Sequence, residues 1–202
     1  EIMSSDWSSD VCSSDLHLDF LNDPDAYDKQ EQLKAMTVAA DAIVRYAERH
    51  AEKAEQLAQS EDDRMRRSEL EQIADVCRRV PANPPESFHD ALQAYWFIHV
   101  GVISELNTWD AISPGRFDQH LYSLYKKDIE SGELTPEQAR ELLLCFWIKF
   151  NNQPAPLKVG VTAQESGTYN DFALISLGGQ QPDGSDGVNE LSYLCLEVLE
   201  EL

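Results

Sequence analysis

The chain has 202 residues, 42% of them hydrophobic, which suffices for one domain with a core or for part of a larger domain. It carries 37 acidic against 16 basic side chains, and this formal net charge of −21 disfavours nucleic acid and anionic membranes as partners. Because there is no secretory signal and no apolar run of the roughly 18 residues that span a bilayer, we expect a cytoplasmic protein.

The first 16 residues differ in composition from the rest. Residues 4–16 read SSDWSSDVCSSDL, in which Ser-Ser-Asp occurs three times. A polar repeat of this kind buries too little apolar surface to fold, which predicts a disordered tail. The string also resembles the translation of sequencing-adapter DNA. We therefore expect residues 1–16 to be an artefact or a disordered tail, and residues 17–202 to form the domain.

Two helices are predicted next. Residues 25–59 contain no Gly or Pro, and their apolar side chains recur at helical spacing. Residues 62–80 repeat this pattern in a shorter form, and Pro81 ends it. We expect the two helices to form a hairpin.

Three further helices follow. Residues 88–103, FHDALQAYWFIHVGVI, are apolar on nearly every side, which is typical of a helix in the middle of a large protein. In this helix we expect Trp96 and His99 to be core residues without a functional role. The next helix is predicted from about residue 116 to residue 131, before Gly132. Another is predicted from Thr135-Pro136-Glu137-Gln138, a strong helix start, to about Phe150.

Extended structure is predicted after residue 155. The segments 157–162 and 171–179 are short, rich in branched residues or alternating, and bounded by turn residues, which indicates strands. A loop from Gly178 to Gly187 leads to a last helix near Val188. That helix runs to Leu202 without a residue that would end it, so we expect the natural protein to continue further.

Metal and nucleotide sites are not indicated. The four cysteines include no CxxC pair, and the five histidines show no HxxxH or HExxH spacing. Cys145 and Cys195 stand in apolar helical stretches, so we expect buried thiols there. Gly178-Gly179 has no helix placed to make it a phosphate-binding loop.

The stretch NTWDAISPGRFDQH, residues 107–120, places a carboxylate, Asp110, in an apolar and aromatic neighbourhood. Two interpretations stand: an acid that caps a turn or pairs with Arg116, or a substrate-binding acid in a buried pocket. The local residues alone favour the turn. For Arg116 we expect a structural role, in which the planar guanidinium fixes the turn through carboxylates or carbonyls. Tyr169 and Asp171 could reach a pocket, but turn chemistry explains them equally well.

Together with ESFHDALQAYWFIH before it and LGGQQPDGSDGVNELSYLCLEVLE after it, the segment ISPGRFDQHLYSLYKKD resembles the glycyl radical enzymes of the pyruvate formate-lyase superfamily. The resemblance extends from about Asp19 to Leu202. It implies an α/β fold, a barrel of strands wrapped by helices, of which this chain would supply a mostly helical part with a few strands after residue 155. The domain at residues 17–202 would then be truncated at both ends.

The resemblance also implies radical chemistry in the parent enzyme. In this superfamily an activating enzyme, using S-adenosylmethionine and an iron-sulfur cluster, installs a radical on a glycine, which then generates a thiyl radical on a cysteine. None of the four cysteines here lies in the Gly-Cys-x-Glu setting of the thiyl loop, and no Arg-Val-x-Gly-Tyr loop is present. We therefore expect no bound cofactor or metal and no catalytic residue in this chain, which would be inactive alone.

The residue six positions before Arg116 helps to distinguish branches of the superfamily, and the resemblance implies a histidine there in the glycerol and hydroxyproline dehydratase branch. Asp110 there, with KVGVTAQESGTYNDF from Lys158, looks most like the choline trimethylamine-lyases, which cleave the C–N bond of choline to give trimethylamine and acetaldehyde. Asp110 would accept a hydrogen bond from the substrate hydroxyl and offset the ammonium charge. Two alternatives remain: a diol or glycerol dehydratase or other C–X lyase of the superfamily, and a helical interaction module without catalysis. In the enzyme interpretation, the partners are choline, an activating enzyme and further copies of the chain, in the cytoplasm or a bacterial microcompartment.

Overall fold

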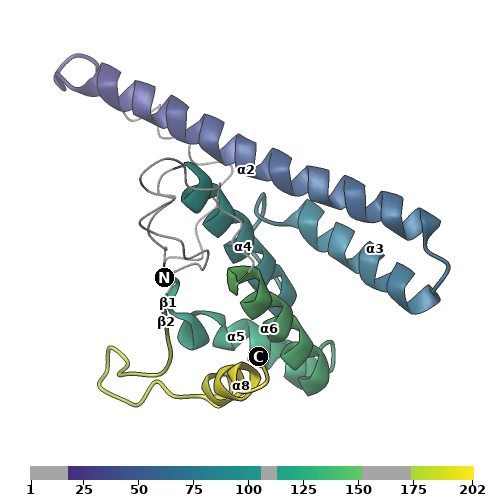
Figure 1. Cartoon of the computed structure of the whole chain (residues 1–202). Helices are drawn as coiled ribbons and strands as arrows, with labels where there is room; N and C mark the ends of the chain where they lie inside the picture. Colours follow the sequence, from purple (N-terminus) through teal and green to yellow (C-terminus); the bar gives the residue numbers. More distant parts are fainter. Residues whose placement is uncertain (1–17, 106–112, 152–173) are drawn as a thin grey trace, which may run out of the picture. The chain divides into compact units, whose positions relative to one another are not determined.

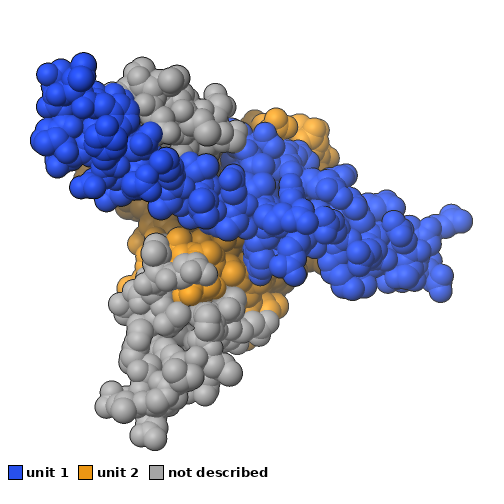
Figure 2. Space-filling view, turned by 90° about the horizontal axis from the view of Figure 1, so that it is seen from above, with its two compact units in different colours: residues 1–85 blue, residues 86–202 orange. Residues whose placement is uncertain are grey.

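A computed structural model of the chain describes residues 18–105, 113–151 and 174–202 (Figure 1). The chain divides into two compact units, residues 1–85 and residues 86–202, which Figure 2 colours separately. Helices make up most of the described part, and its strands are short. The expected α/β class, mostly helical with few strands, is thereby confirmed.

The first unit is the predicted helical hairpin. Helix α2 (Ala26–Ser60) and helix α3 (Arg64–Arg79) lie side by side, joined by a short connection (Figure 1). The buried face of the second half of α2 consists of small side chains, which let two helices approach closely: Ala47, Ala51, Ala54 and Ala58. On the surface, the guanidinium of Arg78 forms two hydrogen bonds of 2.8 Å with the carboxylate of Glu55.

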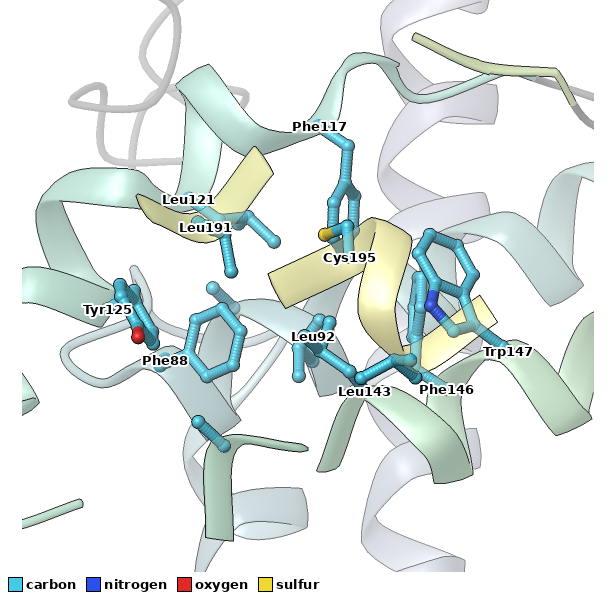
Figure 3. Packing of buried hydrophobic residues seen from close by; sticks show 13 residues of the cluster. Phe88, Leu92, Phe117, Leu121, Tyr125, Leu143, Phe146, Trp147, Leu191 and Cys195 are labelled. Atoms are coloured by element: carbon cyan, nitrogen blue, oxygen red, sulfur yellow. The ribbon is translucent and has the colours of Figure 1, made fainter. Parts of the chain in front are cut away.

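The second unit is built on four helices: α4 (Phe88–Glu105), α5 (Phe117–Ser131), α6 (Pro136–Asn151) and α8 (Glu190–Leu199). All four contribute to one hydrophobic core, shown in Figure 3. Its largest side chains are Phe88, Leu92, Phe117, Leu121, Tyr125, Leu143, Phe146, Trp147 and Leu191. Because α4 and α6 both supply aromatic rings, this core joins segments that are distant in sequence.

Local signals fix the ends of α5 and α6. Gly132 ends α5 in the left-handed region, with φ of +76°, which favours glycine. Before α6, the Thr135 hydroxyl accepts a hydrogen bond of 3.2 Å from the Gln138 backbone N–H, and the Gln138 side chain accepts one of 2.9 Å from the Thr135 N–H. The capping box predicted from these residues is confirmed.

Two short strands, β1 (Gly115–Arg116) and β2 (Ile175–Ser176), form a parallel pair in which Gly115 lies opposite Ile175. The predicted strand at 171–179 thus contains β2, whereas the one at 157–162 lies outside the described residues. The helix predicted from about Arg116 to Ser131 is confirmed as α5, which begins at Phe117 because Arg116 pairs in β1.

Helix α8 begins at Glu190, close to the predicted start. The side chain of Asn189 accepts a hydrogen bond from the backbone N–H of Ser192 and so caps the helix. The prediction that the helix runs to Leu202 was wrong, because it ends at Leu199. Within the described ranges, every helix is too short or too polar to cross a membrane.

Candidate functional site

The predicted substrate-binding acid, Asp110, lies outside the described residues, and so do Tyr169 and Asp171. Their roles therefore stay predictions. Ser113 lies three residues after Asp110 in the chain, and Leu174 lies three residues after Asp171. The structure does show how the chain is anchored at these two points.

The two points lie next to each other. The hydroxyl of Ser113 accepts a hydrogen bond of 3.0 Å from the backbone N–H of Leu174, and β1 and β2 pair directly afterwards. Because the strands are parallel, the chain enters both at the same end of the pair. The segments that contain Asp110 and Asp171 thus join the described structure at neighbouring positions.

Arg116 makes a structural contact of the predicted kind, to a carbonyl, but in a distant loop and not in the neighbouring turn at residues 113–115. Its Nη1 donates a short hydrogen bond to the backbone carbonyl of Gln180, a residue 64 positions further along the chain. The Arg116 side chain is exposed. Its partner is a backbone carbonyl, which is one of the two kinds of partner that we expected for it. The structural role expected of Arg116 is confirmed, with the contact reaching the loop after β2.

A buried carboxylate that sequence reasoning missed lies two residues later. Asp118 is 0% exposed, and its Oδ2 accepts hydrogen bonds from the Gly178 backbone N–H, at 2.7 Å, and from the Ser192 hydroxyl. Its Oδ1 accepts a bond of 2.9 Å from the Gln119 N–H. A buried carboxylate requires such partners. Asp118 therefore ties the start of α5 to the loop after β2 and to the first turn of α8.

Gln119 completes the attachment. Its Nε2 donates to the carbonyl of Gly178, so consecutive side chains of α5 bind the N–H and the C=O of the same residue. Gly178 has φ of +64°, and a Cβ there would lie 2.8 Å from the Val188 side chain, so only glycine fits. We call the side chains of Arg116, Asp118 and Gln119, which hold residues 178–180, the α5 clamp.

The sequence holds a signal from which two buried carboxylates of α5, Asp118 and Asp128, could have been predicted. Asp118, Leu121, Tyr125 and Asp128 are spaced by three, four and three residues, which places them on one face of a helix. All four are buried. An aspartate at an apolar position of an amphipathic helix therefore predicts a buried, hydrogen-bonded carboxylate.

His99 is a core residue and Trp96 is a partly buried aromatic that packs against the core, as expected. His99 is 1% exposed, and its Nδ1 lies 3.4 Å from the hydroxyl of Tyr95. The rings of Tyr95, Trp96 and Phe150 all lie against the imidazole, with centroids 5.0 to 5.6 Å away. The arrangement is that of a packed histidine.

The expectation of buried thiols is confirmed for Cys195 and wrong for Cys145, which is exposed. On α6 the buried side chains are Ala139, Leu143, Phe146 and Trp147. Cys145 follows Leu143 by two positions, roughly 200° around the helix, and so faces away from the core. Because nearly every residue of LLLCFWIKF is apolar, the sequence does not show which face of this helix is buried.

No three His, Cys, Asp or Glu side chains in the described ranges come together so as to hold a metal ion.

An open depression of about 480 Å³ lies beside α8, with Tyr122, Gln181, Glu190 and Tyr193 among its lining residues. The Tyr122 hydroxyl donates a hydrogen bond of 2.8 Å to Glu190, which raises the pKa of Tyr122.

A family model and several known proteins match this chain over most of its length. The family model described as pyruvate formate lyase-like matches residues 12–202. A trans-4-hydroxy-L-proline dehydratase of Clostridioides difficile is 53% identical over 98% of this chain and 25% of its own length. An isethionate sulfite-lyase of Nitratidesulfovibrio vulgaris is 38% identical over 91% of this chain and 22% of its own length.

Solved structures of dehydratases have the same fold as this chain over most of its length. The C. difficile hydroxyproline dehydratase with bound trans-4-hydroxy-L-proline matches with a TM-score of 0.89 and 54% identity, over 96% of this chain and 25% of that one. The glycerol dehydratase of Clostridium butyricum matches with a TM-score of 0.82 and 32% identity, over 95% and 24%. The chain thus spans about a quarter of the length of these relatives.

Proposed function

Because this chain belongs to the pyruvate formate lyase-like family of glycyl radical enzymes, we propose that its parent protein is a dehydratase that removes the hydroxyl group of a small substrate as water. The observation that supports this most strongly is the 53% identity to a hydroxyproline dehydratase across 98% of the chain. The glycerol dehydratase structure points to the same reaction class.

The comparisons favour a dehydratase over the choline trimethylamine-lyase that the resemblance suggested. By their names, the relatives act on trans-4-hydroxy-L-proline, on isethionate and on (2S)-3-sulfopropanediol. The hydroxyproline and sulfopropanediol enzymes are named dehydratases, and the isethionate enzyme is named a sulfite-lyase. The expectation of choline rested on Asp110 and one loop, whereas these matches extend over most of the chain.

In charge and hydrogen bonding Asp110 suits hydroxylated ammonium compounds in general, although the resemblance implies a histidine at this position in the hydroxyproline dehydratase branch. Hydroxyproline carries both a hydroxyl and a ring ammonium, and either can donate a hydrogen bond to a carboxylate, whereas the quaternary ammonium of choline cannot. At an effective dielectric constant near 20, a unit charge pair at ~4 Å gains ~4 kcal/mol before desolvation is counted. We therefore propose that Asp110 binds the substrate, and that hydroxyproline or a similar hydroxylated ammonium compound is that substrate.

The radical residues have to come from elsewhere in the parent protein. The described cysteines are two buried thiols and one exposed thiol on the outer face of α6, and no cysteine of the chain stands in a Gly-Cys-x-Glu sequence. We propose that an activating enzyme using S-adenosylmethionine installs the glycyl radical outside the present chain. Substrate binding, through Asp110, is the contribution that we assign to the present chain.

A second candidate reaction is cleavage of a C–S bond. Identity to isethionate sulfite-lyases reaches 38%, over 91% of the chain. Isethionate is an anion without an ammonium group, and a carboxylate at its site has no cation to pair with and would repel it. Asp110 thus argues for a cationic or zwitterionic substrate and against a sulfonate.

The experiment is a kinetic comparison in the full-length protein, activated by its activating enzyme. Wild type, Asp110→Asn and a matched control, Asp183→Asn, are assayed with trans-4-hydroxy-L-proline, 1,2-propanediol, isethionate and choline. Asp183 is an exposed loop carboxylate that binds only Ser185 among the described residues. We expect water loss from hydroxyproline in wild type and in the control. In Asp110→Asn, kcat/KM should fall on the order of 10- to 100-fold.

Two results would contradict the proposal. If wild type cleaves isethionate or choline and dehydrates none of the substrates, the parent protein is a C–S or C–N lyase and not a dehydratase. Equal kcat/KM for Asp110→Asn and Asp183→Asn would remove Asp110 from the binding site while leaving the dehydratase assignment intact.

A further inference from the structure

Helix α8 is apolar on two faces. On one face, Leu191 and Cys195 point into the hydrophobic core that α8 shares with α5 and α6 (Figure 3). On the other face, Tyr193 is 61% exposed and Leu196 is 52% exposed. Leu199 follows three residues later on the same side and is also exposed. We call Tyr193, Leu196 and Leu199 the outer face of α8. A helix that is apolar all round is typical of the interior of a large protein.

The open depression beside α8 adjoins the outer face, because Tyr193 belongs to both. Two carboxylates, Asp186 and Glu190, line it together with the ring of Tyr122 from α5. Glu190 accepts the hydrogen bond of Tyr122, which fixes its carboxylate at this place. None of the described lining residues is basic. Aromatic rings beside carboxylates favour a guanidinium or an ammonium group as the occupant.

The other end of the outer face is acidic as well. Glu197 lies in the last turn of α8, which holds no basic residue, and Glu200 and Glu201 follow it. Arg140 of α6 pairs with Glu197 and Glu201. Because the C-terminal end of a helix favours cations, a segment that covers the outer face is stabilised by basic side chains at both ends.

A second copy of this chain is disfavoured as that segment. The charged side chains of α8, Glu190 and Glu197, are both acidic, so two copies that met through their outer faces would bring carboxylates together. The net charge of −21 adds to this repulsion. The chain spans 25% of the length of the hydroxyproline dehydratase that it matches. A segment of the same polypeptide would be present at a high effective concentration.

We propose that the outer face of α8 is an interface within the parent protein, covered by an apolar segment from outside the present 202 residues. We assign to that segment a lysine or arginine side chain that enters the depression between Tyr122, Tyr193 and the two carboxylates. The proposal goes beyond the dehydratase reaction and does not depend on which substrate the parent protein takes.

Hydroxyl-radical footprinting read by mass spectrometry measures side-chain exposure in the wild-type protein, without any substitution. It is applied to the full-length protein before activation and to the 202-residue chain. Tyr27, 69% exposed at the start of α2, is the matched tyrosine control. We expect Tyr193 and Leu196 to be oxidised roughly tenfold more slowly in the full-length protein than in the 202-residue chain. Oxidation of Tyr27 should agree within about twofold between the two.

The cationic part of the proposal is tested by the double variant Asp186→Asn, Glu190→Gln. It removes both charges from the depression, while the glutamine can still accept the hydrogen bond of Tyr122. Glu133→Gln is the control, because Glu133 is an exposed carboxylate of the same unit that does not line the depression. In the full-length protein, we expect the double variant to speed oxidation of Tyr193 about threefold and the control to leave it unchanged.

Three results would contradict the proposal. Oxidation of Tyr193 and Leu196 at the same rate in both proteins, or equal slowing at Tyr27, would overturn it. Slow oxidation that depends on protein concentration, in either protein, would assign the outer face to a second copy instead. Equal oxidation of Tyr193 in the double variant and in Glu133→Gln would overturn the cationic part. The substrate assay alone decides the proposed function, so the two proposals fail separately.

Discussion

The carboxylate of Asp128 accepts a hydrogen bond of 2.7 Å from the backbone N–H of Phe88, forty residues earlier in the chain. Phe88 is the first residue of α4, and the N–H groups of a helix's first turn have no acceptor within the helix. Asp128 supplies one. Both residues are buried, so this bond attaches α4 to α5 inside the core.

Removal of this acceptor should destabilise the second unit. We expect Asp128→Ala to lower the free energy of unfolding by roughly 2–3 kcal/mol, because it leaves the Phe88 N–H buried without its acceptor. Urea unfolding of the 202-residue chain, followed by tryptophan fluorescence, measures the change. Glu130→Ala, at an exposed position of the same helix, should change it by no more than about 0.5 kcal/mol. Similar losses in both variants would show that the buried bond contributes little.

The capping box of α6 gives a second prediction. Thr135→Ala removes the hydroxyl that accepts from the Gln138 N–H and should cost about 1 kcal/mol. Thr135→Ser keeps a hydroxyl at the same position and should stay near wild type. Thermal unfolding monitored by circular dichroism distinguishes them. If serine and alanine were equally destabilising, the loss would come from the methyl group and not from the cap.

The sequence predicted what depends on neighbouring residues. The hairpin of α2 and α3, the Gly132 stop and the Thr135 capping box all follow from local spacing and local hydrogen bonds, and the structure has them. The resemblance carried by ISPGRFDQHLYSLYKKD supplied the family. At the helix stop and in the capping box, a few residues within one turn decide the conformation of the backbone.

Contacts between distant segments were not predictable in this way. Asp118 meets Gly178 sixty residues away, and β1 exists only because β2 pairs with it. A strand of two residues has no periodicity to detect. The exposure of Cys145 was missed for a related reason: in a uniformly apolar stretch, only the tertiary packing decides which face is buried.

Cys195 makes the stability depend on pH in the alkaline range. Burial, aided by the negative charge of Asp118, raises the pKa of its thiol from 9.0 to about 12. Between these values the unfolded chain releases the thiol proton and the folded chain keeps it. The free energy of unfolding should therefore be unaffected below pH 9 and fall as the pH rises toward 12, by up to ~1.4 kcal/mol per pH unit.

Comparison with Cys195→Ala isolates this effect from other groups that titrate at high pH. The alanine variant should be less stable at neutral pH because of the space it leaves in the core. Its free energy of unfolding should decline less steeply above pH 9 than that of wild type. Parallel declines in urea unfolding series would mean that Cys195 does not titrate differently in the two states.

Thiol accessibility should separate Cys145 from the buried cysteines. In a chain with Cys12 replaced by serine, we expect a thiol-specific disulfide reagent to modify Cys145 rapidly, because its side chain is exposed. Cys77 and Cys195 should react only on unfolding. Cys145→Ala should abolish the fast phase, and Cys195→Ala should leave it unchanged. A fast phase that survives Cys145→Ala would show that a buried thiol is reached in the folded chain.

The most direct measurement is a competition assay with the activated full-length protein. Trans-4-hydroxy-L-proline and choline are supplied together at equal concentration, and the consumption of each is followed by mass spectrometry. We expect hydroxyproline to lose water while choline stays intact. Release of trimethylamine from choline, with hydroxyproline unchanged, would contradict the dehydratase assignment.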